Sequence, residues 1–314
     1  MVSGEQVVRD AIAFNHPSRI PILFINKDHF DGDILLYDLS YGENGHNEWG
    51  YRFVSLDDGT MGQPDEAVIP DWGLLETFAW PMLRREARLA NVEAFKERAG
   101  GRYLIGGLGL TGFTLYSFLR GFENSMYDFA TGSEACGILL DRIFGHETRL
   151  IELAADAGLH GVHFADDWGS QDGLIINPDL WRALFKERYR AQFARAHELG
   201  VHVWFHCCGN IIDILDDFHE VGVDVMNVSQ PNVVDIEAVG RRLRGKQCFM
   251  VPISYQTVSI SGTPDEIHAE ARRLYDALAA PEGGFIGYVE EYGCMGMSDE
   301  NYRACGEAFR ALSA

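Results

Sequence analysis

The chain has 314 residues and a formal net charge of −21, from 26 Lys and Arg against 47 Asp and Glu. Nucleic acids and anionic membrane surfaces repel such an acidic protein, so neither is expected as a partner. No run reaches the ~18 consecutive apolar residues of a membrane helix, and the charged first residues lack the apolar centre of a signal peptide. Six cysteines are too few for a disulfide framework in a chain of this length. Together these features predict a cytoplasmic protein.

Short apolar runs alternate with amphipathic stretches along the chain. The runs, which we predict as strands, span 20–26, 103–110, 161–168, 202–209, 223–230, 248–254 and 285–291. Helical spacing of apolar residues is clearest at 178–199, 211–221, 235–243 and 264–279. Alternating strands and helices form a parallel sheet, and about seven or eight such units predict a closed (β/α)8 TIM barrel. We expect residues 1–314 to form a single domain.

Residues 31–90 break this alternation. The segment is rich in Gly, Asp, Trp and Tyr and shows no sustained helical or strand period. We interpret it as an aromatic-rich insertion after the first strand, lying over the barrel mouth. Such an insertion either shapes a substrate pocket or serves only as a structural cap.

Polar residues gather where the predicted strands end, which is where barrel active sites lie. We predict substrate contacts at Asn26, Asp166, Trp168, Asn227 and Tyr255. Neighbouring residues point in opposite directions, so one residue of a pair faces the pocket more directly than the other. For the first acidic pair we favour Asp167 as a catalytic group that orients substrate or relays a proton. For the second pair, Glu290 and Glu291, the choice stays open.

One strand carries a candidate metal-binding pair. Side chains alternate across a strand, so His206 and Cys208 face one way and Cys207 the other. Cys294 follows the last strand and should reach the same rim. One imidazole and two thiolates suit Zn²⁺ and leave a position open for substrate. The alternative is that these are buried packing residues, as we expect for Cys136, Cys207, Cys248 and Cys305.

From about residue 155 onward, the chain resembles the uroporphyrinogen decarboxylase superfamily. The matching motifs, in order, are DDWGS at 166–170, HCCGN at 206–210, EVGVD at 220–224, GTPDEI at 262–267, GC at 293–294 and EN at 300–301. They cover about half of the chain, and the first half is similar only loosely. The resemblance implies a (β/α)8 barrel, in agreement with the pattern of runs.

The superfamily contains two kinds of chemistry. The decarboxylases carry an N-terminal arginine signature that grips substrate carboxylates, whereas the corresponding segment here, 19–26, reads RIPILFIN. The His-x-Cys pair with a distant Cys is instead similar to the zinc site of the corrinoid-dependent methyltransferases. That resemblance implies His206, Cys208 and Cys294 as zinc ligands and leaves any fourth protein ligand unassigned.

The resemblance implies a zinc-dependent methyltransferase of a corrinoid pathway. The aromatic-rich segment favours transfer from a methoxylated donor, such as an aryl methyl ether, to a Co(I) corrinoid carried by a partner protein. Transfer from a methylcobamide to a thiol of the coenzyme M type is the first alternative. A metal-free decarboxylase and a non-catalytic zinc- or corrinoid-binding subunit are the others. Whether the chain forms a homodimer stays open.

Overall fold

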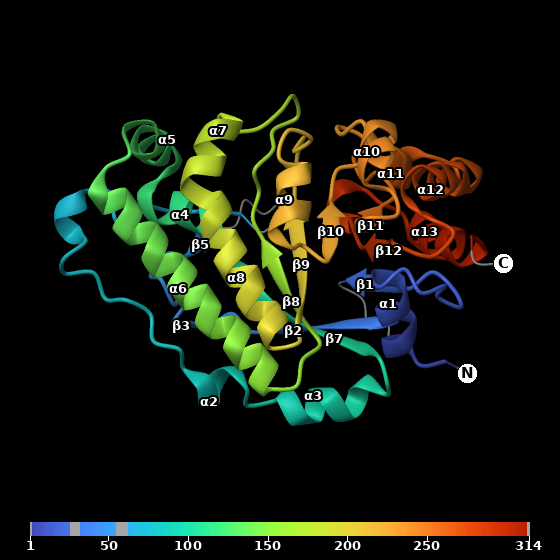
Figure 1. Ribbon diagram of the computed structural model, residues 1–314, viewed down its shortest axis with the longest axis horizontal. Helices are drawn as coiled ribbons and strands as arrows, with labels where there is room; N and C mark the ends of the chain where they lie inside the picture. Colours follow the sequence, from blue (N-terminus) through green and yellow to red (C-terminus); the bar gives the residue numbers. More distant parts are fainter. Residues whose placement is uncertain (1, 26–31, 55–61, 313–314) are drawn as a thin grey trace.

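Eight parallel strands form a closed barrel at the centre of the protein (Figure 1). The computed structural model describes residues 2–25, 32–54 and 62–312. Around the barrel the strands follow the order β1-β12-β11-β10-β9-β8-β7-β2. Their bounds are β1 (Ile22–Ile25), β2 (Ile34–Asp38), β7 (Tyr103–Leu110), β8 (Gly161–Ala165), β9 (His202–Cys207), β10 (Val225–Val228), β11 (Cys248–Pro252) and β12 (Phe285–Glu290). The predicted (β/α)8 architecture is therefore confirmed.

One barrel strand lies inside the segment that was interpreted as an insertion. β2 pairs in parallel with β7 over five residues, from Ile34 opposite Tyr103 to Asp38 opposite Gly107. The irregular region therefore begins after the second strand of the barrel, not after the first. It contains two short antiparallel hairpins, β3 (Gly42–Glu43) with β4 (His46–Asn47) and β5 (Phe53–Val54) with β6 (Gln63–Pro64).

Helices surround the barrel on its outer side (Figure 1). The N-terminal half contains α1 (Gly4–Ile12), the turn η1 (Trp72–Leu74), α2 (Arg85–Arg88), α3 (Val92–Ala99), α4 (Gly112–Arg120), α5 (Phe122–Thr131) and α6 (Glu134–Asp156). Next come α7 (Pro178–Trp181), the π-helical turn η2 (Arg182–Lys186), α8 (Glu187–Glu198), α9 (Leu215–Val221) and α10 (Ile236–Leu243). The chain ends with α11 (Val258–Ser261), α12 (Pro264–Leu278), the turn η3 (Gly293–Met295) and α13 (Asp299–Ala311). Within the described ranges, no helix combines the length and apolar character that a membrane span requires.

Two helix starts follow the capping signals in the sequence. The Asn177 side chain accepts a hydrogen bond from Asp179 N ahead of α7, with Pro178 in the first turn. Thr263 and Glu266 form a reciprocal capping box at the start of α12. These caps fix where each helix begins and therefore how long the connection from the preceding strand is.

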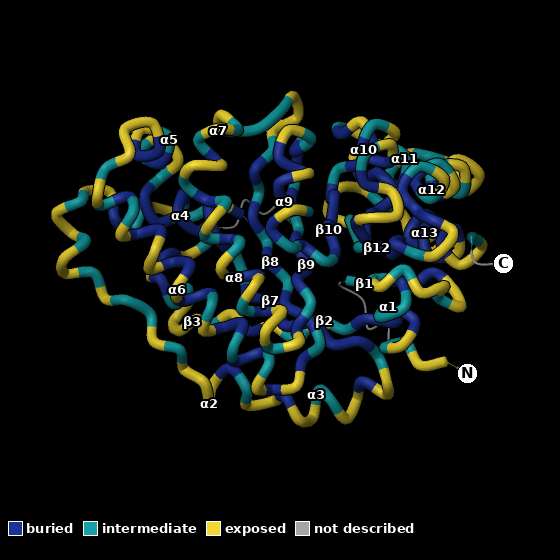
Figure 2. The backbone as a smooth tube through the Cα atoms, in the orientation of Figure 1, coloured by how far each residue is buried: buried dark blue, intermediate teal, exposed yellow. Residues whose placement is uncertain are grey.

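The barrel strands are largely buried (Figure 2), and the buried side chains form two clusters, one inside the barrel and one outside it. Tyr103, Trp204, Met250 and Ile286 belong to the cluster that fills the barrel interior. Val203, Phe205 and Cys207 belong to the larger cluster between strands and helices. Because large side chains fill the interior, a ligand can reach the strands only at the barrel mouth.

Candidate metal centre

Three side chains at the carboxyl ends of β8 and β9 place their ligand atoms within 4.8 Å of one another: Asp167, His206 and Cys208. His206 Nε2 lies 3.5 Å from Cys208 Sγ and 3.7 Å from Asp167 Oδ1. Ligands of a tetrahedral Zn²⁺ at ~2.0–2.3 Å from the ion are themselves separated by about 3.5 Å. These two distances therefore match a metal-binding set.

The alternation of β9 explains why these side chains meet. Trp204 points into the barrel interior, so His206, two residues further on, faces the same way. Cys207 packs in the outer cluster, where its Sγ accepts a hydrogen bond from Trp168 N at 3.2 Å. The predicted orientations of His206 and Cys207 are thus those of the structure. Cys136, Cys248 and Cys305 are buried, as expected of packing residues.

Asp167 is held against Cys208 by the backbone. Its Oδ1 accepts a hydrogen bond from Cys208 N at 2.8 Å, and its own N–H donates to Thr114 Oγ1 at 2.8 Å. Just beyond, Gly169 and Gly209 pack backbone against backbone: a Cβ on Gly209 would lie 2.1 Å from Gly169 C. This contact holds the connection after β8 against the connection after β9, which brings the carboxylate to the imidazole and the thiol.

Asn227 on β10 lies behind His206. Its Oδ1 is 2.7 Å from His206 Nδ1, and its Nδ2 donates to Met250 O at 2.8 Å. Since the amide nitrogen is engaged by a carbonyl, the amide oxygen must accept from Nδ1–H. Asn227 is only 1% exposed and both ends of its amide are engaged, so the structure gives it the role of orienting the imidazole. Its predicted contact with substrate stays a prediction.

The electrostatics of the triad favour a cation. Burial by itself lowers the pKa of His206, but the Cys208 thiol, the Asp167 carboxylate and the Asn227 amide together raise it to about 10. Positive charge is thus stabilised at Nε2, between a thiol and a carboxylate. The donor set of one imidazole, one thiolate and one carboxylate fits Zn²⁺.

Cys294 lies apart from this group. It occupies the exposed turn η3, which starts three residues after β12 ends, and it does not belong to the ligand group found among the described residues. Its assignment as a zinc ligand stays a prediction.

Two predicted substrate contacts are core residues. Asp166 is fully buried, and its carboxylate accepts from Phe113 N at 3.1 Å, from Thr114 N at 2.8 Å and from the Tyr189 hydroxyl. Trp168 is also fully buried, stacked on Phe113 with ring centroids 4.7 Å apart. Both residues therefore stabilise the connection that carries Asp167 and do not line the mouth. Asn26 lies outside the described residues.

Three tyrosines connect the other predicted groups. Tyr288 and Tyr292 both donate to Glu290 Oε2, which fixes that carboxylate at the end of β12. Tyr255 stacks on Tyr292 with ring centroids 4.5 Å apart, and its hydroxyl interacts with Cys208. Burial raises the pKa of Tyr255 to about 12, and the Cys208 thiol adds to the effect, so Tyr255 remains a hydrogen-bond donor at neutral pH. Glu291 lies directly after β12, is half-buried and also interacts with another residue.

A chamber of about 570 Å³ opens beside the triad. Its walls come from β2, the hairpin β3–β4, β5 and the ends of β7 and β8, and they include Tyr41, Tyr51, Phe53 and His163. The His163 ring centroid lies 6.0 Å from that of His206, so the His163 wall of the chamber adjoins the candidate metal centre. The sequence analysis predicted a role for the aromatic segment but none for His163 or Thr114. These two residues come close to the site only through the register of β7, β8 and β9, which the sequence pattern does not reveal.

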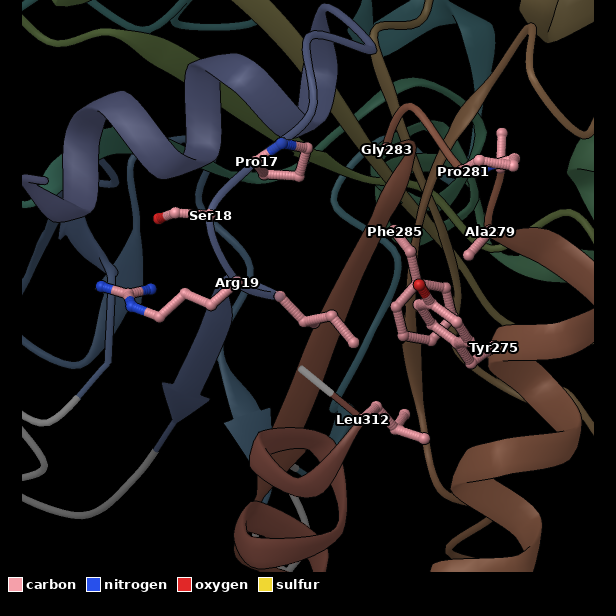
Figure 3. A pocket seen from close by; sticks show the side chains of 11 residues that line it. Pro17, Ser18, Arg19, Tyr275, Ala279, Pro281, Gly283, Phe285 and Leu312 are labelled. Carbon is pink, nitrogen blue, oxygen red and sulfur yellow. The ribbon is translucent and has the colours of Figure 1, made fainter. Parts of the chain in front are cut away.

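A second cavity, of about 180 Å³, lies at the opposite end of the barrel (Figure 3). Its walls come from the residues before β1 and β12 together with Tyr275 and Leu312. Figure 3 shows the Arg19 side chain directed away from these two residues, and its guanidinium pairs with Asp33. Because catalytic groups of such barrels gather at the carboxyl ends of the strands, we assign the functional site to the larger chamber.

Comparison with known proteins agrees with this architecture. The structure superimposes on a methyltransferase from Methanosarcina mazei with a TM-score of 0.77 and 16% sequence identity, covering 100% of each chain. A D-psicose 3-epimerase shows a weaker likeness, with a TM-score of 0.43, 11% identity and coverage of 72% of this chain and 84% of the other. No curated protein sequence gives a significant match. The family model described as uroporphyrinogen decarboxylase (URO-D) matches residues 84–305, and the chain therefore belongs to the uroporphyrinogen decarboxylase family.

Proposed function

We propose that the protein is a zinc-dependent methyltransferase that moves a methyl group from a methoxylated donor to a Co(I) corrinoid presented by a partner protein. The observation that carries this proposal is the triad of Asp167, His206 and Cys208 at the carboxyl ends of β8 and β9. The chamber adjoins it through His163, whose ring centroid lies 6.0 Å from that of His206. The fold shared with a methyltransferase from Methanosarcina mazei supports the reaction class. An aryl methyl ether suits the aromatic walls of the chamber.

In this proposal Asp167, His206 and Cys208 hold the ion. Bound Zn²⁺ supplies Lewis acidity toward the ether oxygen of the donor. Asn227 keeps His206 Nε2 turned toward Cys208, and Thr114 keeps Asp167 in place. The inward-facing residues of β9 thus determine where the donor oxygen must lie.

The transfer step balances without an external oxidant or reductant. The bond between the methyl carbon and the ether oxygen breaks, and its electron pair stays on the oxygen. Co(I) supplies both electrons of the new carbon–cobalt bond and becomes Co(III), while the oxygen takes up one proton. Tyr255, Glu290 and Glu291 are the proposed source of that proton or of a hydrogen bond to the oxygen.

We retain Cys294 as a proposed additional ligand from η3. Its thiol is exposed, so it can meet an incoming ion without unpacking the core. The three preassembled groups should bind zinc without it, but with lower affinity. This separates the role of Cys294 from that of Cys208, which belongs to the triad.

Metal analysis followed by a methyl-transfer assay tests the proposal. We expect about one zinc per chain after purification under reducing conditions, and conversion of Co(I) cobalamin to methylcobalamin with a methoxylated phenol, followed by absorbance. Methylcobalamin with a thiol provides the comparison for the reverse direction. Turnover only with the thiol would overturn the proposed direction, and a metal-free active decarboxylase would overturn the reaction class.

A further inference from the structure

The chamber beside His206 has aromatic walls that are rigidly packed. Tyr51 meets Phe53 edge to face with ring centroids 5.6 Å apart, and it meets Phe118 in the same way at 5.5 Å. Tyr51 is only 3% exposed, so its ring position is fixed by the core. Gly107 also lines the chamber, packed closely against Leu36: a Cβ on Gly107 would lie 3.2 Å from the Leu36 side chain. A flat ring fits between such walls better than a flexible chain does.

The inner end of the chamber lies next to the metal centre. His163 and Ala165 line it, and they pair in register with Trp204 and His206 of β9. His163 thus connects this end of the chamber with His206, since the two ring centroids lie 6.0 Å apart.

The charge of the chamber wall is negative. Asp38, at the end of β2, is the acidic residue of the lining, and the described lining residues include no Lys or Arg. Asp38 accepts hydrogen bonds from Ser40 N at 2.8 Å and from Ser40 Oγ at 3.0 Å, so its carboxylate is held at the wall.

The nearest described cations lie behind the wall. The Arg84 and Arg88 guanidinium groups sit over the Tyr41 ring at 5.8 and 5.7 Å from its centroid. Arg88 is buried and paired with Glu48, and Arg84 lines an adjoining cavity that shares Tyr41 with the chamber and also contains Glu43 and Glu48. Neither arginine is among the described residues that line the chamber.

From these observations we infer that the chamber selects an uncharged aromatic ring, of the methoxyphenol type, and discriminates against the same ring carrying a carboxylate. The inference rests on the proposed function, since it takes the chamber as the site of the methyl donor. An anionic ring would meet the Asp38 carboxylate and the field of a protein with net charge −21. An uncharged ring keeps the aromatic contacts, and its hydroxyl can donate to Asp38.

Calorimetric titration without cobalamin tests the inference, because neither ligand can then react. We compare 2-methoxyphenol with 4-hydroxy-3-methoxybenzoate, which differ only by the carboxylate. The expected result is binding of the uncharged ring at least about tenfold tighter, the size of one like-charge contact at moderate screening. Equal or tighter binding of the benzoate, or no binding of the phenol, would overturn the inference.

Two matched variants locate the source of the preference. Asp38→Asn keeps an oxygen for Ser40 N and removes the charge, so it should tighten benzoate binding by about threefold or more relative to the phenol. Asp276→Asn, on the exposed face of α12, changes net charge equally and should leave the ratio unchanged. A ratio that does not respond to Asp38→Asn would also overturn the inference. Loss of methyl transfer with the preference intact would instead overturn the proposed function.

Discussion

Asn227 accepts the Nδ1 proton of His206 at 2.7 Å while donating to Met250 O, so one buried amide fixes the orientation of the imidazole. These two hydrogen bonds link three neighbouring strands, β9, β10 and β11, at the level of the candidate metal centre. It leaves His206 Nε2 as the atom that faces Cys208 and Asp167. Four predictions follow from this and from neighbouring contacts.

Removing the amide should weaken metal binding without removing a ligand. We expect Asn227→Leu to lower zinc affinity by about 10- to 100-fold, the usual cost of losing a hydrogen-bonding partner of a ligating histidine. Competition with a fluorescent zinc chelator measures the change. Asn124→Ala, on the outer helix α5, is the control and should bind zinc like the parent protein. An Asn227→Leu protein with unchanged affinity would contradict the proposed role.

Cys207, Cys208 and Cys294 should respond differently to substitution by alanine. Cys208→Ala should lose zinc, because it removes a triad member, and Cys294→Ala should lower the affinity while retaining binding. Cys207→Ala should retain full zinc and lose only about 1–2 kcal/mol of unfolding free energy, since its buried thiol packs in the core and accepts from Trp168 N. Zinc analysis measures the metal bound by each variant, and urea unfolding measures its free energy of unfolding. Full affinity in Cys294→Ala would show that the triad is sufficient.

The contact between Gly169 and Gly209 predicts that alanine lowers the free energy of unfolding more at position 209 than at position 200. Gly209 and Gly200 both have positive φ, +76° and +73°, but only Gly209 has backbone in the way of a Cβ. Gly200→Ala should cost about 1–2 kcal/mol for its backbone conformation. Gly209→Ala should cost about 2 kcal/mol more and should lose zinc, because the connections carrying Asp167 and Cys208 are pushed apart. Equal effects of the two substitutions on unfolding and zinc content would exclude this role.

The carboxyl of Glu147 predicts how stability varies with pH. Burial, with a further contribution from Asp166, raises the pKa of Glu147 to about 8. The folded state then binds this proton more tightly than the unfolded state does. The stabilisation is therefore complete below pH ~4.5 and is lost as pH rises toward 8, by about 1 kcal/mol per pH unit.

Urea unfolding at pH 6 and pH 8 measures this loss. Glu147→Gln preserves the shape of the protonated carboxyl, so it should reduce the pH dependence. The share that comes from Asp166, whose pKa burial raises to about 7, should remain. Glu187→Gln removes an exposed carboxylate and should leave the dependence as it is. A pH dependence that persists unchanged in Glu147→Gln would show that another group is responsible.

The sequence was sufficient for the barrel and for the orientation of β9, since both depend on local periodicity. Trp204, His206 and Cys207 take the faces that alternation predicts. β2 was missed because its five residues, ILLYD, alternate between buried or half-buried and more exposed positions within a polar region. Only its pairing with β7 identifies it as a barrel strand.

The burial of Asp166 could not be read from its neighbours. An acidic residue beside Asp167 at a strand end is expected to face solvent or ligand, and here it accepts from the first amides of α4, more than fifty residues earlier in the chain. These hydrogen bonds compensate for the burial of the Asp166 carboxylate. They depend on where α4 begins relative to β8, and this tertiary arrangement cannot be predicted from neighbouring residues. For the same reason Asn227 was predicted to contact substrate, although its partners are His206 and Met250.

The chamber walls and the metal triad come from separate stretches of the chain. Tyr41, Tyr51 and Phe53 lie between β2 and β7, whereas Asp167, His206 and Cys208 lie after β8 and on or just after β9. Mutations in one stretch can accumulate without altering the other, because each is anchored to its own strands. Under the proposed function, descendants of such a protein could therefore acquire new donors by exchanging residues 39–54 while keeping Asp167, His206 and Cys208. In the laboratory, this segment is the natural target for a library that redirects specificity.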